Sequence, residues 1–392
     1  MRPSGSAGGF GVARGRNHSR VRVLVVNAGS STLKLSLLDS ADRLLGASEL
    51  CAPGGQVDPG GLRAALASEG LDEADAVGHR IVHGGERFHQ AVVIDADVER
   101  ALRQFVDLAP LHQPKSLAAL EAVSAALPNV TAVACFDTAF HATLPASAAT
   151  YALPSAWRER WGLRRFGFHG LSHSWIARHT PDLLSQSSST LRIVSCHLGA
   201  GASLCAIAGG HSLDTTMGFT PLEGLVMATR SGSVDPGLVL WLLDHSGMPA
   251  AELATALEHE SGLLGLAGTD DMRQVVERAG LGEDMAELAL DVYVHRLRAG
   301  IGAMTASLGG LDALVFTGGV GEHSPEVRAR TASGLAFLGL AIDPVRNAEA
   351  DGDIEITAAG ANVRTLVIRS REDLEMARQV RDVLGGPVAA VS

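Results

Sequence analysis

The sequence predicts an α/β protein built from two related domains. Its 392 residues are enough for two domains of ordinary size. A β-strand, a turn of small and hydroxylated residues, and a second strand occupy residues 23–38, and the same order returns at 192–207. Helical stretches and short apolar runs alternate along the rest of the chain, which is typical of α/β folds. We therefore expect each domain to contribute one hairpin to a shared cleft.

The first hairpin has an unusual turn. An apolar run at 23–26 leads into the small residues at 27–32, and alternating leucines follow at 33–37. Small side chains allow a polyanion to approach the backbone N–H groups, and Lys34 adds a positive charge. The turn is therefore either a phosphate-binding loop or an ordinary hairpin with a polar tip. It is not a P-loop, because a second strand follows where a P-loop has a helix.

The remaining elements follow from apolar periodicity and from turn residues. Helices are expected around 61–70, at 97–127 with a proline break at 109–114, at 237–260, at 284–307 and after 371. Strands are expected at 76–82, 130–136, 313–317 and 364–368, and a long loop at 217–235. Arg80, Asp137 and the glycine-rich segment 318–321 lie at or near strand ends, where α/β folds place chemistry. The alternatives are a surface arginine at a turn for Arg80 and a helix N-cap for Asp137.

The composition excludes several classes of protein. A formal charge of -11 argues against a nucleic-acid partner. No apolar stretch reaches the roughly 20 residues of a membrane span, so no membrane contact is expected. Four scattered cysteines, three of them in strand-like runs, predict buried thiols in the cytoplasm rather than disulfides or zinc ligands. Residues 1–20 contain no acidic residue and lack the apolar h-region of a secretory signal peptide. We therefore expect them to form a disordered extension, with an amphipathic transit segment as the alternative.

Ten motifs, in order, resemble those of the acetate kinase family. They are NAGSSTLK, GHRIVHGGE, APLHQP, CFDTAFH, RRFGFHGLSH, CHLGAGAS, DTTMGFTPLEGL, TRSG, VFTGGVGEHS and REDLEMAR. The resemblance implies a place in the actin-like superfamily with sugar kinases and Hsp70, hence two ribonuclease-H-like domains with the active site in the cleft between them. It assigns residues 21–140 and 373–392 to an N-terminal domain, and residues 141–372 to a C-terminal domain with the nucleotide site.

The resemblance also implies an activity. It indicates a phosphotransferase with a carboxyl group as acceptor, which converts acetate and ATP reversibly to acetyl phosphate and ADP by direct in-line transfer. Mg²⁺, with Mn²⁺ as a substitute, and a homodimer are implied with it. Propionate is the nearest alternative substrate, because one methylene in an apolar pocket is worth only about 1–3 kcal/mol. A degenerate nucleotide-binding regulator would lack catalytic residues that are present here, and a dinucleotide oxidoreductase would need a Rossmann fingerprint, which is missing.

The family's functional residues can be transferred to matching positions. Arg80, Asp137, His169 and Arg230 are implied to be catalytic, with His169 and Arg230 stabilising the transition state. Asp137 is not expected to act as a general base, because a carboxylic acid is already ionised at neutral pH. Asn27 and Glu372 are implied at the metal. The implied acyl site consists of Arg80, Val82, Leu111, His112, Phe168 and Pro221, for whose apolar members plain core packing is the alternative. The implied ATP site consists of Lys34, His197, Gly199, Gly201, Asp271, Met272, Arg273, Gly319, Val320 and Gly321.

The chain departs from the family's usual motifs at a few positions. Ala200 replaces an asparagine in the second hairpin, which bears on the metal or phosphate network. His323 also replaces an asparagine, and Met272 replaces an aromatic residue. Lys115 and Ser233 also differ from the residues usual in the family, and these two changes bear on which carboxylic acid is the substrate.

Overall fold

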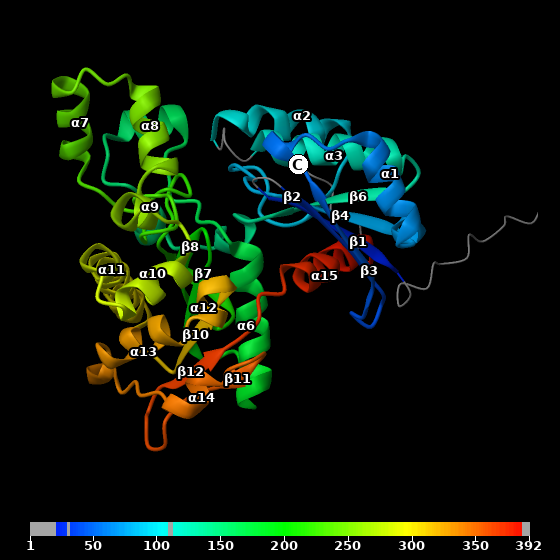
Figure 1. Cartoon of the computed structure of the whole chain (residues 1–392). Helices are drawn as coiled ribbons and strands as arrows, with labels where there is room; N and C mark the ends of the chain where they lie inside the picture. Colours follow the sequence, from blue (N-terminus) through cyan, green and yellow to red (C-terminus); the bar gives the residue numbers. More distant parts are fainter. Residues whose placement is uncertain (1–20, 30–31, 109–112, 386–392) are drawn as a thin grey trace, which may run out of the picture.

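The computed structural model describes residues 21–29, 32–108 and 113–385, and consists of two mixed six-stranded sheets with helices around them (Figure 1). The first sheet contains β1 (Val23–Ala28), β2 (Thr32–Leu38), β3 (Leu44–Cys51), β4 (Ala76–Ile81), β5 (Val92–Val93) and β6 (Thr131–Phe136). The second contains β7 (Arg192–Leu198), β8 (Ala202–Ala208), β9 (His211–Thr215), β10 (Ala313–Thr317), β11 (Ile354–Glu355) and β12 (Arg364–Val367).

The two sheets share one topology. The strand orders are β3-β2-β1-β4-β6-β5 and β9-β8-β7-β10-β12-β11. In each sheet the first three strands form an antiparallel meander, the next two strands run parallel to the first strand of that meander, and the last is an antiparallel edge strand. The prediction of a duplicated α/β fold is confirmed.

Helices cover both faces of each sheet because the central strands are apolar on both faces. In β1, Leu24 and Val26 pack against α1 (Pro59–Ser68) and α3 (Gln113–Ala126), while Val23 and Val25 pack against α15 (Glu372–Gly385). The second sheet lies between α6 (Gly170–Leu184) and α11 (Asp284–Leu308). The last helix of the described chain therefore returns to the first sheet (Figure 1).

The other helices are mostly short. They are α2 (Ala96–Gln104), α4 (Ala146–Ala149), α5 (Ser155–Trp161), α7 (Pro236–His245), α8 (Ala250–His259), α9 (Gly262–Ala267), α10 (Met272–Gly280), α12 (Gly318–His323), α13 (Pro325–Ser333) and α14 (Pro344–Ala348). The single helix expected at 237–260 is wrong, because Gly247 at φ 70° and Pro249 separate α7 from α8. The glycine-rich turn expected at 318–321 belongs to the short helix α12 instead.

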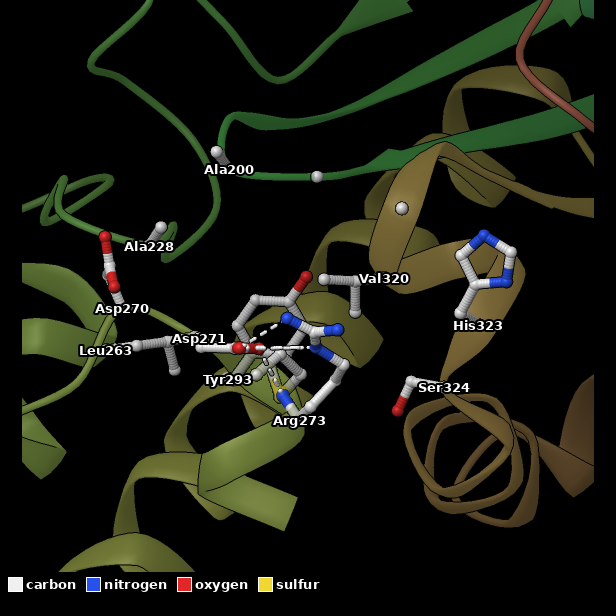
Figure 2. Close-up of a pocket in the computed structure, with 13 residues that line it drawn as sticks. Ala200, Ala228, Leu263, Asp270, Asp271, Arg273, Tyr293, Val320, His323 and Ser324 are labelled. Atoms are coloured by element: carbon white, nitrogen blue, oxygen red, sulfur yellow. Dashed lines mark hydrogen bonds and ion pairs between the residues drawn. The ribbon is translucent and has the colours of Figure 1, made fainter. Parts of the chain in front are cut away.

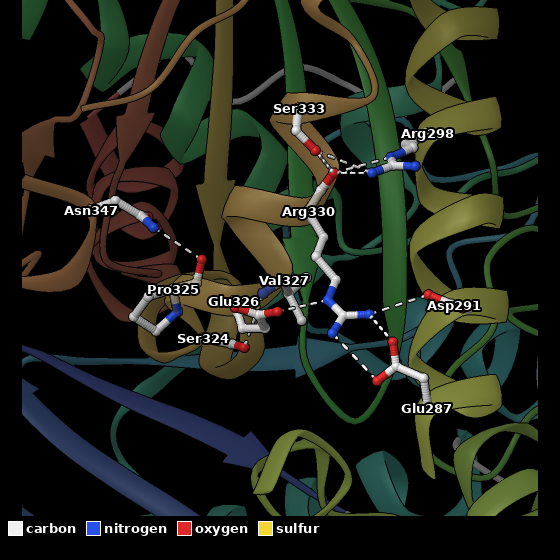
Figure 3. A network of polar contacts seen from close by, with 10 residues as sticks. All are labelled: Glu287, Asp291, Arg298, Ser324, Pro325, Glu326, Val327, Arg330, Ser333 and Asn347. Carbon is white, nitrogen blue, oxygen red and sulfur yellow. Dashed lines mark hydrogen bonds and ion pairs between the residues drawn. The ribbon is translucent and has the colours of Figure 1, made fainter. Parts of the chain in front are cut away.

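An arginine network joins α13 to α11 and so fixes α12, which precedes α13 (Figure 3). Arg330 Nε donates to Glu326 Oε1 at 2.6 Å on its own helix. Its Nη1 donates to Glu287 Oε1 at 2.6 Å and to Asp291 Oδ1 at 3.2 Å, both on α11. The carboxylates of Glu287 and Glu326 raise the pKa of Arg330, so the guanidinium keeps its charge and its contacts.

Two predictions from composition, on the cysteines and on membrane spans, can be compared with the described residues. Cys135, Cys196 and Cys205 are buried free thiols, as predicted, whereas Cys51 is free and exposed. In the described ranges, the helices are all too short or too polar to cross a lipid bilayer.

Buried histidines make the stability of the fold depend on pH. His79 in β4 is 1% exposed and its ring nitrogens have no hydrogen-bond partner among the described residues. Burial lowers the pKa of His79 to about 3. Because the unfolded chain binds a proton near pH 6.5 and the buried ring does not, stability is highest above about pH 6.5 and falls as the pH drops toward 3.

We expect the free energy of unfolding to fall between pH 7 and pH 5 by about 2 kcal/mol for each such histidine. Urea unfolding at the two pH values measures this loss. His79→Leu should remove the contribution of one histidine and flatten the dependence by that amount. An unchanged pH dependence in His79→Leu would show that His79 does not carry the linkage.

Candidate active site

Arg80 is held at the end of β4 by groups from three other elements. Its Nε donates to Asp137 Oδ1 at 3.0 Å and its Nη2 donates to Asp137 Oδ2 at 2.7 Å. The third nitrogen, Nη1, donates to Asn27 Oδ1 at 3.2 Å and lies 3.5 Å from Glu372 Oε2. β4 and β6 are parallel neighbours, so Arg80 and Asp137 reach the same edge of the sheet. The structure therefore brings these four predicted residues together.

Charge and burial fix the pair of Arg80 and Asp137. The two side chains are 19% and 2% exposed. Burial disfavours the charged guanidinium, but the carboxylates of Asp137 and Glu372 outweigh it and raise the pKa of Arg80. Burial raises the pKa of Asp137, while Arg80 opposes this rise. The Asp137 carboxylate thus holds an arginine in a bidentate contact, and the residue that caps the following helical turn is Thr138.

Asn27 and Glu372 provide oxygen atoms beside this pair. Asn27 Nδ2 donates to Glu372 Oε2 at 3.4 Å, and Glu372 is the first residue of α15. Within the described ranges, no group of three or more histidine, cysteine or acidic side chains could hold a metal ion. Magnesium binds proteins through one or two carboxylates and keeps waters and substrate phosphates as its other ligands. The two residues fit such an ion and do not form a closed cage.

His169 projects toward the second hairpin from a strained position. Its φ of 57° is left-handed, and it caps the start of α6. Gly170 follows because a Cβ there would lie 2.2 Å from the Asp137 carbonyl oxygen. A Cβ on Gly201 would lie 3.3 Å from His169 Nε2 and 3.4 Å from Arg230 Nη1. His169 Nε2 and the Arg230 guanidinium therefore face one small region beside Gly201.

Arg230 is held in the long loop that the sequence predicted. Its Nη1 donates to the Pro221 carbonyl at 3.2 Å and lies 3.7 Å from Met227 Sδ. Burial lowers the pKa of Arg230, and the Glu258 carboxylate opposes this effect. An arginine keeps its charge at neutral pH even so. The loop thus presents a fixed positive charge next to His169.

Three of the predicted acyl-site residues, Val82, Phe168 and Pro221, are linked to Arg230 directly or through a shared buried cluster. Val82 and Phe168 are 9% and 1% exposed and belong to the same buried cluster as Met227. Pro221 contacts Arg230 through its carbonyl oxygen. Two further predicted residues, Leu111 and His112, lie outside the described residues.

A separate pocket of about 470 Å³ opens in the half of the molecule that contains the second sheet (Figure 2). Figure 2 shows Arg273 folded back onto Asp271, which it contacts at 2.8 Å, with Val320 and Tyr293 close by. The pocket has the volume of a small-molecule site. Its lining comprises Gly199, Ala200, Ala228, Leu263, Asp270, Asp271, Met272, Arg273, Tyr293, Gly319, Val320, His323 and Ser324.

Six of the ten predicted ATP residues line this pocket, namely Gly199, Asp271, Met272, Arg273, Gly319 and Val320. The other four lie elsewhere. His197 packs its ring 4.3 Å from that of His169, and Gly201 lies between His169 and Arg230. Gly321 is buried in α12 near the backbone of Phe316. Lys34 pairs with Asn27 in the β1–β2 register, and its exposed ammonium lies 3.9 Å from Glu49.

Sequence reasoning missed several lining residues. Tyr293 and Leu263 come from helices, where an apolar residue is indistinguishable by pattern from an ordinary core residue. Asp270 precedes the predicted ATP residue Asp271, and this position was the only indication in the sequence that Asp270 lines the pocket. Ser324 ends the VFTGGVGEHS motif but was not assigned to the site, and Ala228 had no signal.

Comparisons with known proteins agree on one family. The model described as the acetokinase family matches residues 61–378. The acetate kinase of Nostoc punctiforme is 49% identical over 315 residues, which cover 80% of this chain and 78% of that protein. A crystal structure of Porphyromonas gingivalis acetate kinase is similar with a TM-score of 0.86 and 33% identity, over 93% of this chain and 100% of that one. A propionate kinase structure from Francisella tularensis has a TM-score of 0.85 and 33% identity, over 92% and 98%.

Proposed function

The chain belongs to the acetokinase family, and we propose that it transfers the γ-phosphoryl group of ATP to acetate, reversibly and with Mg²⁺, to give acetyl phosphate and ADP. The observation that carries this proposal is that His169 and Arg230 face the same region beside Gly201 of the second hairpin, while Asp137 holds Arg80 at the end of β4. Gly199 and Ala200 of the same hairpin line the pocket of about 470 Å³. Phosphoryl transfer requires positioning and charge stabilisation more than covalent chemistry, and these residues supply both.

In this mechanism the arginines handle the anions. Arg80, oriented by Asp137, binds the acetate carboxylate, whose oxygen attacks the γ-phosphorus in line. Arg230 neutralises the charge that develops on the equatorial oxygens. Planar guanidinium groups suit both anions because they can bind two oxygens at once.

His169 donates a hydrogen bond rather than forming a phosphoenzyme. Burial lowers the pKa of His169 well below its ordinary value, and the neighbouring His197 and Arg80 lower it further. The ring is therefore neutral at pH 7 and offers one N–H group. Asp137 has no proton to remove, since acetate is ionised, and acts by holding Arg80.

Asn27 and Glu372 would hold the magnesium ion, in part through water, and the bound ion would offset the charge of the ATP phosphates. The pocket lined by Asp271, Val320 and Tyr293 would receive the nucleoside. We further propose the division into domains 21–140 with 373–392 and 141–372, a cytoplasmic location, and a homodimer.

A hydroxamate assay tests the proposed function. Purified protein is incubated with ATP, Mg²⁺ and hydroxylamine, together with formate, acetate, propionate or butyrate. We expect acyl hydroxamate with acetate and a dependence on both ATP and metal. Absence of hydroxamate with every acid contradicts the kinase proposal. Propionate is the second candidate substrate, because the chain is as similar in structure to a propionate kinase as to an acetate kinase.

Val82→Ala should change the choice of acid. Removing two methyl groups from the apolar side of the site leaves room for one more methylene, which is worth about 1–3 kcal/mol. We expect the ratio of kcat/KM for propionate to that for acetate to rise about tenfold. Val77→Ala is the matched control, because Val77 lies in β4, which Val82 directly follows, but packs in the cluster under α1 and α3. An unchanged ratio in Val82→Ala would remove Val82 from the acyl site.

A further inference from the structure

Ser203 bridges two histidine rings that both come from α6. Its Oγ lies 3.0 Å from His169 Nδ1 and 2.8 Å from His173 Nε2. On the far side, His173 Nδ1 lies 2.9 Å from Ser195 Oγ. Ser203, His173 and Ser195 are completely buried. The four side chains therefore form an unbroken chain that ends at His169.

The elements that carry this chain are firmly fixed. His169 is the N-cap residue of α6 and His173 lies in its first turn, and both rings reach the Ser203 hydroxyl. Ser195 and Ser203 lie in β7 and β8, which are hydrogen-bonded neighbours in the second sheet. The two serines thus contact the two ring nitrogens of His173 from adjacent strands, and Ser203 also contacts His169.

Each ring in the chain is neutral. Burial lowers the pKa of His169 and of His173 well below the ordinary value. The charged and titratable groups that face His169 are His197, Arg80, His173 and Arg230, and each opposes its protonation. A neutral imidazole carries one N–H, so the tautomer decides whether Nε2 is a donor or an acceptor.

The Ser203 hydroxyl has one hydrogen and can serve only one ring as donor. If it donates to His169 Nδ1, it accepts from His173 Nε2–H, and His173 Nδ1 accepts from Ser195. In the reverse arrangement, His169 Nδ1–H donates to Ser203, Ser203 donates to His173 Nε2, and His173 Nδ1–H donates to Ser195. His169 Nε2 then carries a lone pair and no hydrogen. The Arg230 guanidinium shares the region beside Gly201 with that nitrogen, which makes it a site for an anion. A lone pair there would repel an anion, while an N–H would bind it.

We propose that Ser203 and His173 are positioning residues that hold the proton of His169 on Nε2, where it donates to the phosphoryl group in transfer. The direction runs from the Ser195 hydroxyl to His173 Nδ1, from His173 Nε2–H to Ser203, and from the Ser203 hydroxyl to His169 Nδ1. The inference rests on the proposed function for the identity of the anion. The tautomer itself does not depend on it.

Nitrogen NMR of protein labelled with ¹⁵N-histidine tests the relay, because protonated and unprotonated ring nitrogens differ widely in chemical shift. The His169 signals are assigned by their loss in His169→Gln. In the unaltered protein we expect His169 to be protonated at Nε2 and bare at Nδ1. The opposite tautomer overturns the inference, and this test needs no variant at Ser203.

Kinetics of Ser203→Ala supply the second readout. We expect a mixture of His169 tautomers and a fall in kcat of about tenfold to a hundredfold, with KM for ATP unchanged. Ser203→Thr, which keeps the hydroxyl and suits a strand, should restore both. Unchanged tautomer and kcat in Ser203→Ala would contradict the relay.

Ser174→Ala is the matched control. Ser174 follows His173 in α6 and is buried like Ser203. Its hydroxyl, however, donates to Glu375 Oε1 of α15 at 2.8 Å and not to a histidine. We expect no change in the His169 tautomer or in kcat. Wild-type protein that carries the Nε2 proton yet forms no acyl phosphate would support the relay and contradict the proposed function.

Discussion

Replacing Arg230 with leucine is expected to lower kcat for acyl phosphate formation by about a thousandfold or more. In the proposed mechanism, the guanidinium group beside His169 Nε2 and Gly201 is the positive charge that the 217–235 loop presents to the transferring group. Leucine is apolar and fits beside the buried Met227, but it removes that charge and the contacts of the guanidinium with Met227 and the Pro221 carbonyl. The hydroxamate assay at saturating ATP and acetate measures the loss.

The lysine variant separates charge from geometry. Arg230→Lys keeps one positive charge but loses the planar pair of donors, one of which also holds the Pro221 carbonyl. We expect an activity between those of Arg230→Leu and the unaltered protein, with unchanged stability toward urea. Activity of Arg230→Leu within tenfold of the unaltered protein would exclude Arg230 from the transfer step.

Asp137→Asn is expected to lower both stability and activity. Breaking a buried pair by removing one charge typically destabilises a protein by about 3–5 kcal/mol, and here Arg80 keeps only the more distant Glu372 carboxylate, 3.5 Å from its Nη1. An amide also turns an NH₂ group toward the Arg80 guanidinium, where two oxygens now accept its hydrogen bonds. Since Arg80 loses its orientation, kcat/KM for acetate should fall by more than about a hundredfold.

An exposed pair of the same geometry provides the control. Arg192 binds Asp312 through Nε at 3.0 Å and Nη2 at 2.7 Å, but the two side chains are 39% and 33% exposed. Asp312→Asn should destabilise by no more than about 1 kcal/mol and leave the kinetics unchanged. Urea unfolding and steady-state kinetics of both variants decide the matter. Equal effects of the two substitutions would mean that the burial of Arg80 and Asp137 has no special role.

The duplicated fold could be predicted from the sequence because each of the two hairpins is recognisable within a short stretch of residues. The two hairpins at 23–38 and 192–207 each consist of apolar strands around a turn of small residues, and such patterns need no tertiary information. The break between α7 and α8 was missed although Gly247 and Pro249 mark it, because the apolar residues on either side were given more weight than these two helix breakers. The return of α15 to the first sheet follows from tertiary packing, which periodicity does not encode.

The site residues likewise fall into those that a local pattern predicts and those that only the tertiary structure reveals. Arg80 and Asp137 were found because charged residues at the ends of apolar strands are conspicuous, and parallel strands bring their ends together. Lys34 was assigned to ATP by the family resemblance; its exposed ammonium lies 3.9 Å from Glu49, and it is not among the residues that line the pocket. Tyr293 is buried in a long helix, and only the packing of α11 beside α10 reveals that it borders a pocket.

The stereochemical course at phosphorus tests the central claim, which is direct transfer from ATP to the carboxylate held by Arg80. ATP made chiral with oxygen isotopes at the γ-phosphoryl group is converted to acetyl phosphate, and the configuration of the product is determined. A single in-line displacement predicts inversion. Retention would require a phosphorylated enzyme intermediate, and would contradict the role of His169 as a hydrogen-bond donor.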